Sequence, residues 1–137
     1  MDFTFAMIKP DAVRAGSSGA ILNLIEKSGF EIVRMEKRTL NRATVEQFYA
    51  VHKERSFFGE MVDFVISGPV VIIALKKEGA VLAWRELMGA TNPATAAYGT
   101  VRKLYGANIG SNAAHGSDAP ETATSELGLF FPDLRVS

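Results

Sequence analysis

Apolar residues in the first forty positions follow the two-residue period of a strand and then the period of a helix. Large apolar side chains occupy every second position from Phe3 to Met7, which predicts a buried strand that ends at Lys9. The segment from Ile21 to Ile25 has helical spacing. Residues 31–40 predict a second strand, in which Arg34, Glu36 and Arg38 share one parity, and this indicates a partly exposed or edge position.

Two amphipathic helices and a central strand are predicted in the middle of the chain. One helix opens at Thr44, and a second stripe with helical spacing runs from Phe58 to Val65, so the two are expected to form a helical hairpin. Residues 70–75 are continuously apolar, as in a central strand that is covered on both faces. Residues 81–88 then predict a short helix.

The C-terminal third is expected to contain a long loop, a helix and a last strand. Residues 89–116 are loop-rich, with a weak helical pattern at 100–105, and a loop of this length in a compact domain is usually functional. Asp118 and Glu121 have the spacing of a capping box and predict a helix start, while residues 127–131 predict a final strand. The order β-α-β, helical insert, β-α-β fits an α+β sandwich with helices packed on an open sheet.

Composition narrows the class of protein. The 137 residues predict a single domain, 1–137, that is long enough to bury a core, and 47% hydrophobic residues indicate a globular chain. Basic and acidic residues number 15 each, which argues against a nucleic-acid partner held by bulk charge. The chain has no cysteine, so thiolate chemistry is excluded. Neither a secretory signal nor a membrane-spanning run is present, so we expect a cytoplasmic protein with no membrane partner.

The most distinctive segment is residues 112–118, which surround His115 with small residues. Small neighbours leave the imidazole edge open to a bulky charged substrate, and Gly116 allows a close approach of the backbone. A helix that starts at Asp118 would place free N–H groups beside the histidine, and such groups attract phosphate. A histidine in a turn also has an ordinary structural explanation, so other residues must decide between the two.

Several polar or aromatic residues are not required by the folding pattern. Lys9, Arg85, Thr91 and Arg102 would together bind a polyphosphate, with the arginine forks clamping its oxygens, although each alone is a common surface residue. Phe57 is an aromatic residue beyond those of its helical stripe. It either stacks on a nucleobase or packs as a hydrophobic staple.

Tyr49, His52 and Glu126 complete the candidates. Tyr49 suits a core stripe, while its hydroxyl is able to reach a phosphate. His52 is expected at a helix end or at the core margin, not as the nucleophile. Glu126 lies eleven positions after the loop histidine, where a carboxylate would hold one imidazole nitrogen and leave the other free to attack; a generic surface glutamate is the alternative. The glycines of residues 14–20 match neither common phosphate-loop motif and predict a turn before a helix.

Together these residues resemble the nucleoside diphosphate kinase family, from about Phe3 to Phe131. The most specific match is Asn-Ala-Ala-His-Gly-Ser-Asp at residues 112–118, which follows the family signature Asn-x-x-His-Gly-Ser-Asp around its phosphorylated histidine. Five further blocks agree in order: residues 7–11, 55–58, 67–70, 89–94 and 99–102. Ordered agreement of this kind makes a chance similarity implausible.

The resemblance implies a ferredoxin-like sandwich with a four-stranded antiparallel sheet, and a reversible ping-pong transfer of the γ-phosphoryl group from a nucleoside triphosphate, mainly ATP, to a nucleoside diphosphate. It implies that His115 is the nucleophile, that Glu126 orients it, and that Ser117 belongs to the same hydrogen-bond network. The implied nucleotide contacts are Lys9 and Asn112 at the sugar, Lys9 also at the transferring phosphate, Tyr49, Arg85, Thr91 and Arg102 at the phosphates, and Phe57 on the base. Mg²⁺ is expected to be bound mainly through the nucleotide phosphates, with no protein metal site assigned.

The family is also homo-oligomeric and built from dimers, and three departures from its pattern bear on this chain. Ser56 stands where a proline commonly precedes the aromatic pair, and Tyr98 stands in a subunit-contact loop where many relatives have a proline. The chain stops soon after Phe131, which leaves a tetramer or a hexamer open. None of these departures touches a catalytic position.

Two other classes of function remain to be distinguished. A non-catalytic nucleotide-binding or regulatory module could use the same scaffold, since a fold alone does not decide function. The presence of His115, Glu126, Lys9 and both arginines counts against that reading. Nucleic-acid binding is weaker because the charge is balanced, and it would show as a salt-dependent affinity.

Overall fold

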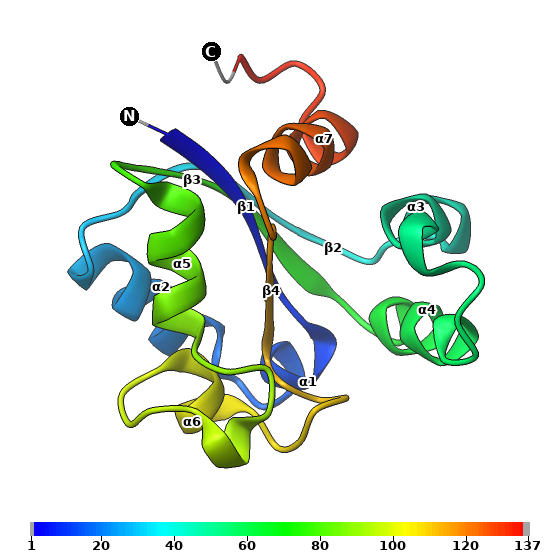
Figure 1. Ribbon diagram of the computed structural model, residues 1–137, viewed down its shortest axis with the longest axis horizontal. Coiled ribbons are helices and arrows are strands. Elements are labelled where there is room, and N and C mark those ends of the chain that lie inside the picture. The colour runs from blue at the N-terminus through cyan, green and yellow to red at the C-terminus, as the bar shows by residue number, and fades with distance from the viewer. Residues whose placement is uncertain (1, 136–137) are drawn as a thin grey trace.

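The computed structural model describes residues 2–135 and is built on one four-stranded antiparallel sheet (Figure 1). The strands are β1 (Asp2–Ile8), β2 (Glu31–Arg38), β3 (Val70–Lys77) and β4 (Ala114–Gly116), and their order is β2-β3-β1-β4. The apolar strands β1 and β3 are therefore central, as the sequence predicts for β3, and the charged strand β2 lies at an edge. The expected ferredoxin-like α+β sandwich is confirmed.

Helices cover both faces of the sheet. They are α1 (Pro10–Arg14), α2 (Ser18–Lys27), α3 (Arg42–Phe48), α4 (Phe58–Ile66), α5 (Ala80–Met88), α6 (Val101–Tyr105) and α7 (Pro120–Phe130), with 3-10 turns at Ala50–His52 and Pro93–Thr95. The helical hairpin α3–α4 stands to the right of the sheet in Figure 1, and α2 and α5 stand to its left. None of the helices within residues 2–135 is long and apolar enough to cross a membrane.

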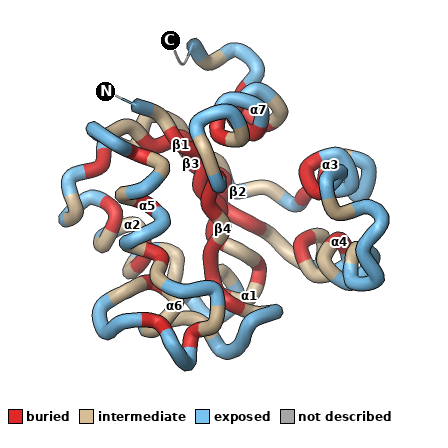
Figure 2. The backbone as a smooth tube through the Cα atoms, viewed as in Figure 1, coloured by how far each residue is buried: buried red, intermediate tan, exposed pale blue. Residues whose placement is uncertain are grey.

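Two apolar cores follow from the alternation of β1. Phe5 and Met7 point to the face that packs against α3, α4 and α7, where Phe48 and Phe130 join them. Ala6 and Ile8 point to the opposite face, together with residues of α2 and α5. Figure 2 shows the buried backbone running along the central strands. The sheet is thus packed on both faces where β1 and β4 meet, and this is where the candidate histidine lies, opposite Met7.

The C-terminal third departs from the sequence prediction in two ways. Residues 127–131 were expected to form a strand, but α7 continues to Phe130, and its buried Leu127 and Phe130 have helical spacing. The expected capping box at Asp118 is also wrong, because the helix is capped at Ala119 without a side-chain bond and has Pro120 in its first turn. The last strand is instead the three-residue β4, which is too short to show a period.

Candidate active site

A cavity of about 1000 Å³ opens between the α3–α4 hairpin, α7, and the loop that precedes β4. Nine of the ten residues proposed from the sequence line it: Lys9, Tyr49, Phe57, Arg85, Thr91, Arg102, Asn112, His115 and Glu126. The tenth, Ser117, is buried directly behind it and contacts Glu126. The tertiary structure therefore gathers in one place residues that come from both ends and the middle of the chain.

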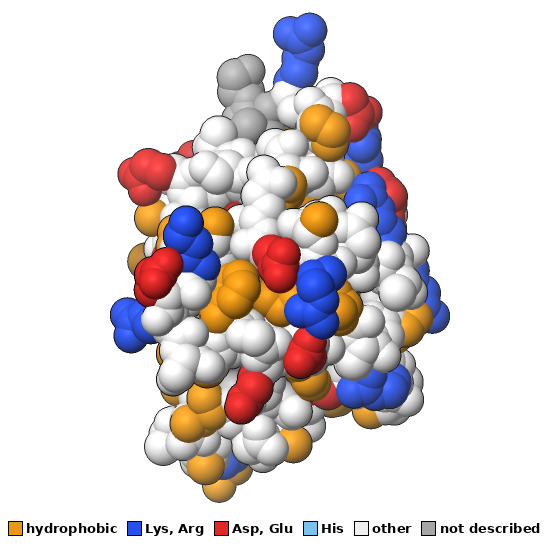
Figure 3. Space-filling view, turned by 90° about the vertical axis from the view of Figure 1, so that its right-hand side faces the viewer, with side chains coloured by type: hydrophobic (Ala, Val, Ile, Leu, Met, Phe, Trp, Pro, Cys, Tyr) orange, Lys and Arg blue, Asp and Glu red, His pale blue; other side chains and the backbone are white. Residues whose placement is uncertain are grey.

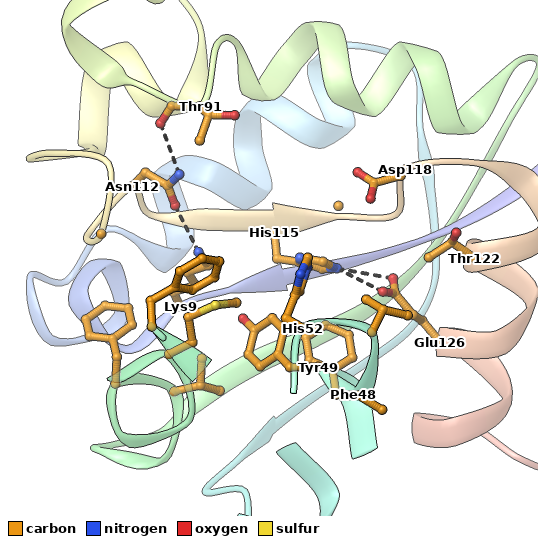
Figure 4. Close-up of a pocket in the computed structure, with 18 of the residues that line it drawn as sticks. Lys9, Phe48, Tyr49, His52, Thr91, Asn112, His115, Asp118, Thr122 and Glu126 are labelled. Carbon is orange, nitrogen blue, oxygen red and sulfur yellow. Dashed lines mark hydrogen bonds and ion pairs between the residues drawn. The ribbon is translucent and has the colours of Figure 1, made fainter. Parts of the chain in front are cut away.

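The central contact joins His115 on β4 to Glu126 on α7 (Figure 4). His115 Nε2 lies 3.1 Å from Glu126 Oε1 and 3.3 Å from Oε2, and the Ser117 hydroxyl donates to Oε1 at 2.7 Å. An ionised carboxylate only accepts hydrogen bonds, so this contact selects the tautomer with the proton on Nε2. The lone pair of Nδ1 is then free to act as a nucleophile. His115 lies on β4, and the helix start that the sequence predicted at Asp118, beside the histidine, is instead at Pro120.

The histidine is also held from behind. Its ring lies edge-on to Phe48 with a centroid separation of 4.7 Å, and its carbonyl accepts a 3.2 Å hydrogen bond from the indole Nε1 of Trp84. A Cβ atom at Gly116 would come within 2.5 Å of Trp84 and of Met88, so only glycine fits there. Gly116 thus serves the close backbone approach expected from the sequence, and the approaching group is the indole of α5.

Lys9, Asn112 and Thr91 form a hydrogen-bonded chain along the pocket floor (Figure 4). Lys9 Nζ donates to Asn112 Oδ1 at 3.0 Å, and Asn112 Nδ2 donates to the Thr91 carbonyl at 3.1 Å. The pKa of Lys9 is lowered to about 8, mainly by burial and also by the nearby Arg102, while Asp11 opposes the shift. The Lys9 side chain is thus half-buried and forms no ion pair with a carboxylate within residues 2–135, which is a suitable environment for receiving an anion.

Two arginines bring further positive charge to the same pocket. Arg102 on α6 donates to the carbonyls of Gly89 and Ala114, each at 3.0 Å, and its pKa is lowered by burial and by the proximity of Arg85. Arg85 on α5 pairs with Asp118 at 2.8 Å, and both side chains are exposed. Arg102 is fixed by the backbone, whereas Arg85 is free to exchange its exposed partner for a ligand oxygen.

The aromatic residues occupy the side of the pocket formed by α3 and α4. Tyr49 is buried, and burial followed by the charge of Glu126 raises the pKa of its hydroxyl, which therefore remains a proton donor. Phe57 caps α4 and is 42% exposed, although it lines the cavity. A staple buried before the helix would not be so accessible, which favours the stacking interpretation.

His52 ends a 3-10 turn, as expected for a helix end, but it also lines the pocket. Its ring centroid is 6.5 Å from that of Tyr49 and 6.1 Å from that of Phe57. Ile109 is a pocket residue that sequence reasoning missed: it is 60% exposed and lines the same cavity. Its one sequence signal is a large apolar side chain in an otherwise polar loop.

The outer face of the α3–α4 hairpin shows no field of one sign. Acidic and basic side chains alternate over the surface in Figure 3. A nucleic-acid backbone is bound through a continuous basic surface. Three basic side chains, those of Lys9, Arg85 and Arg102, converge in the pocket instead.

The chain is similar to known proteins over nearly its whole length. The family model described as nucleoside diphosphate kinase matches residues 2–136. A nucleoside diphosphate kinase of Trichlorobacter lovleyi is 55% identical over 136 residues, with 99% of each chain covered. One of Deinococcus radiodurans is 53% identical over 133 residues, with 97% of this chain and 96% of the relative covered.

Solved structures give the same result. The nucleoside diphosphate kinase of Aquifex aeolicus superposes with a TM-score of 0.95 at 36% identity, and 99% of each chain is covered. The enzyme of Halobacterium salinarum, solved in complex with CDP, superposes with a TM-score of 0.91 at 36% identity, covering 95% of this chain and 87% of the other. On its sequence, its fold and the match over nearly its whole length, the chain belongs to the nucleoside diphosphate kinase family.

Proposed function

We propose that this chain transfers the γ-phosphoryl group of a nucleoside triphosphate, mainly ATP, to a nucleoside diphosphate, through a phosphohistidine at His115. The observation that carries the proposal is the contact of His115 Nε2 with Glu126 inside a cavity that also presents Lys9, Arg85 and Arg102. A nucleophilic nitrogen beside converging cations is what phosphoryl transfer requires. The family membership of the chain supports the same activity.

In the first half-reaction, Nδ1 of His115 attacks the γ-phosphorus in line with the bond to the β-phosphate. The Nδ1–P bond forms, the P–O bond breaks, and the electron pair leaves with the nucleoside diphosphate. Glu126 keeps the proton on Nε2 and stabilises the positive charge that develops on the ring, while Ser117 fixes the carboxylate. In the second half-reaction, a terminal oxygen of another diphosphate attacks the same phosphorus and the N–P bond breaks.

The remaining pocket residues bind and orient the nucleotide in this proposal. Lys9 neutralises the transferring phosphoryl group and, with Asn112, contacts the ribose. Tyr49, Arg85, Thr91 and Arg102 hold the phosphates, because the first is a hydroxyl donor and the arginines offer bidentate forks. Phe57 stacks on the base.

Stacking is tolerant of base identity, because every base has an aromatic face. Phe57 therefore supports broad use of purine and pyrimidine nucleotides. Selectivity would require hydrogen bonds to base edges, in addition to the stacking surface that Phe57 provides.

Mg²⁺ fits this pocket as part of the nucleotide. No group of three or more His, Asp or Glu side chains within residues 2–135 is placed to hold a metal ion, whereas the exposed carboxylate of Asp118 lines the cavity beside Arg85. We expect phosphate oxygens to supply most of the ligands, with Asp118 as the carboxylate at the pocket wall. When bound, the ion neutralises phosphate charge and orients the transferring group.

The proposal also includes the oligomeric state of the protein and its cellular compartment. We expect a homo-oligomer built from dimers, a tetramer or a hexamer, and the exposed apolar side chains of Met35, Tyr98 and Leu104 support contacts between copies. Sedimentation at several concentrations would measure the oligomeric state. The cytoplasm remains the expected compartment, since nucleoside triphosphates are the common phosphoryl donors there.

A labelling experiment tests the activity. The protein is incubated with γ-labelled ATP, and an acid-labile, alkali-stable phosphoenzyme is expected that GDP discharges to GTP. Its control is His115→Ala, which should bind ADP but take up no label. Absence of label on the wild type, with ADP still bound, would support the non-catalytic nucleotide-binding module instead. Full labelling of His115→Ala would contradict the assigned nucleophile.

A further inference from the structure

The backbone immediately before the catalytic strand is strained. Ala113 has φ of 74°, and it is the one residue other than glycine with a positive φ within residues 2–135. The Ala114 N–H donates to the Asn112 carbonyl at 2.9 Å, which closes a three-residue turn around Ala113. This is the rare form of γ-turn, which an L-residue adopts only when its surroundings impose it.

This turn connects two groups that the proposed reaction uses. Asn112, on one side of it, bonds to Lys9 Nζ and to the Thr91 carbonyl. His115 follows two residues after it on β4. A change of the Ala113 backbone angles would therefore move the ribose-contacting amide relative to the nucleophile.

Both backbone groups of Ala113 are held from the start of α1. Its carbonyl accepts the N–H of Lys9 at 2.8 Å, and its own N–H donates to Asp11 Oδ2 at 3.1 Å. Ala113 is fully buried, so without Asp11 its N–H would be buried without a partner. Asp11 Oδ1 is also buried and has no hydrogen-bond partner in the part of the chain that the structure describes.

We propose that Asp11 is a positioning residue for phosphoryl transfer, because its carboxylate holds the strained Ala113 turn and thereby sets Asn112 and His115 relative to each other. The inference rests on the proposed function for its catalytic consequence. Asp11 does not line the cavity and needs no contact with the nucleotide. Its positioning effect passes through one backbone hydrogen bond. Its negative charge also raises the pKa of Lys9, and Asp11→Asn removes that charge while it keeps an acceptor oxygen.

Asp11→Ala and Asp11→Asn test the hydrogen bond. The alanine variant loses the acceptor, and the asparagine variant keeps an acceptor oxygen without the charge. In single-turnover labelling with ATP we expect Asp11→Ala to lower the rate of His115 phosphorylation by about ten-fold or more, with a smaller change in KM. Asp11→Asn should stay within about three-fold of wild type. Equal loss in both variants, or a loss confined to KM, would overturn the proposal.

Relief of the strain supplies a rescue. Ala113→Gly places a residue that tolerates positive φ at the turn, so in the Asp11→Ala background it should restore the rate by about three-fold or more. Failure to rescue, with the double variant folded, contradicts the proposal. Thermal unfolding monitors each variant, and Asp11→Leu replaces Asp11→Ala should the latter not fold, because leucine is close to aspartate in size and carries no acceptor.

A nucleotide-free readout separates this inference from the proposed function. The ¹⁵N resonances of the His115 ring report its tautomer and its contact with Glu126. We expect them to be unchanged in Asp11→Asn and shifted or broadened in Asp11→Ala. Unchanged spectra in both would overturn the positioning role even with an active wild type. If the resonances shift in Asp11→Ala but the wild type takes up no label from ATP, the positioning role of Asp11 stands and the proposed phosphoryl transfer is contradicted.

Discussion

The two walls of the pocket are built differently. The inner wall, formed by Lys9, Asn112, His115 and Glu126 with Ser117 directly behind it, is buried or half-buried, and each of these side chains is hydrogen-bonded to another. The outer wall, formed by Val51, His52, Phe57 and Ile109, lies on a turn, a helix cap and a loop. Three of its four side chains are at least 42% exposed. The groups proposed to do the chemistry are thus held by hydrogen bonds, and the groups proposed to receive a variable base are left accessible.

This difference separates two kinds of kinetic effect. A group held within a hydrogen-bond network contributes through its position at the transition state, so its loss lowers kcat. An exposed stacking surface contributes similarly to the ground state and the transition state, so its loss raises KM. The following changes test that separation, beginning with the largest expected effect.

Glu126→Gln should lower kcat by about 100-fold with little change in KM, because a neutral amide no longer selects the Nε2–H tautomer or stabilises the charged ring. Steady-state kinetics with ATP and a diphosphate acceptor measure both constants. Glu46→Gln, an exposed change on α3 outside the pocket, serves as the control. A pure KM effect in Glu126→Gln would break the distinction between the walls.

Raising the pH should remove the Lys9 charge. The pKa of Lys9 is lowered to about 8, so its ammonium is present below that pH and lost above it. We expect kcat/KM, which reports on the free enzyme, to fall by about ten-fold between pH 7 and pH 9. Lys9→Arg keeps its charge throughout this range, so the fall of kcat/KM between pH 7 and pH 9 should disappear in this variant. A fall of kcat/KM that persists in Lys9→Arg would show that another titrating group causes it.

Phe57→Ala should raise the KM for nucleotides by about five- to ten-fold and leave kcat within about two-fold, because base stacking on an aromatic ring is worth about 1–3 kcal/mol. Phe57→Tyr retains the ring and is the matched control. Purine and pyrimidine substrates are compared in parallel. A large drop in kcat would place Phe57 with the inner wall.

Ser56→Pro should have the smallest effect. No backbone acceptor for the Ser56 N–H is present within residues 2–135, so proline removes no hydrogen bond and restricts the unfolded chain. We expect the free energy of unfolding to rise by about 0.5–1 kcal/mol and KM to fall by about two-fold, as Phe57 becomes better ordered. Ser56→Ala removes the hydroxyl alone and should do neither. A loss of stability would show that the local backbone cannot accommodate proline.

Local patterns predicted most of the fold. Strands β1, β2 and β3 and the helices of the α3–α4 hairpin were predicted because their apolar side chains repeat over six residues or more. The three-residue β4 was missed, and residues 127–131 were assigned to a strand although they largely belong to α7. Short apolar runs do not distinguish a strand from a helix, and packing against β1 decides the matter.

In the site, too, some residues could be selected from the sequence and others only from the tertiary structure. His115, Glu126, Lys9 and Phe57 were selected from motif and chemistry, and they do meet in one pocket. Asp11 and Ile109 received no role, since a carboxylate after a proline and an apolar loop residue are both common in turns. Their significance depends on neighbours that are distant along the chain.

The sequence by itself determined which chemical groups are present, their order, the family signature and the main periodic elements. Only the tertiary structure decided which nitrogen of His115 faces Glu126, that Lys9 meets Asn112 across 103 positions, and that Ala113 is held in a strained turn by Asp11. Periodicity records how a segment meets its local surroundings. Contacts between distant segments arise when the whole sheet and its helices pack together, and no local pattern specifies them.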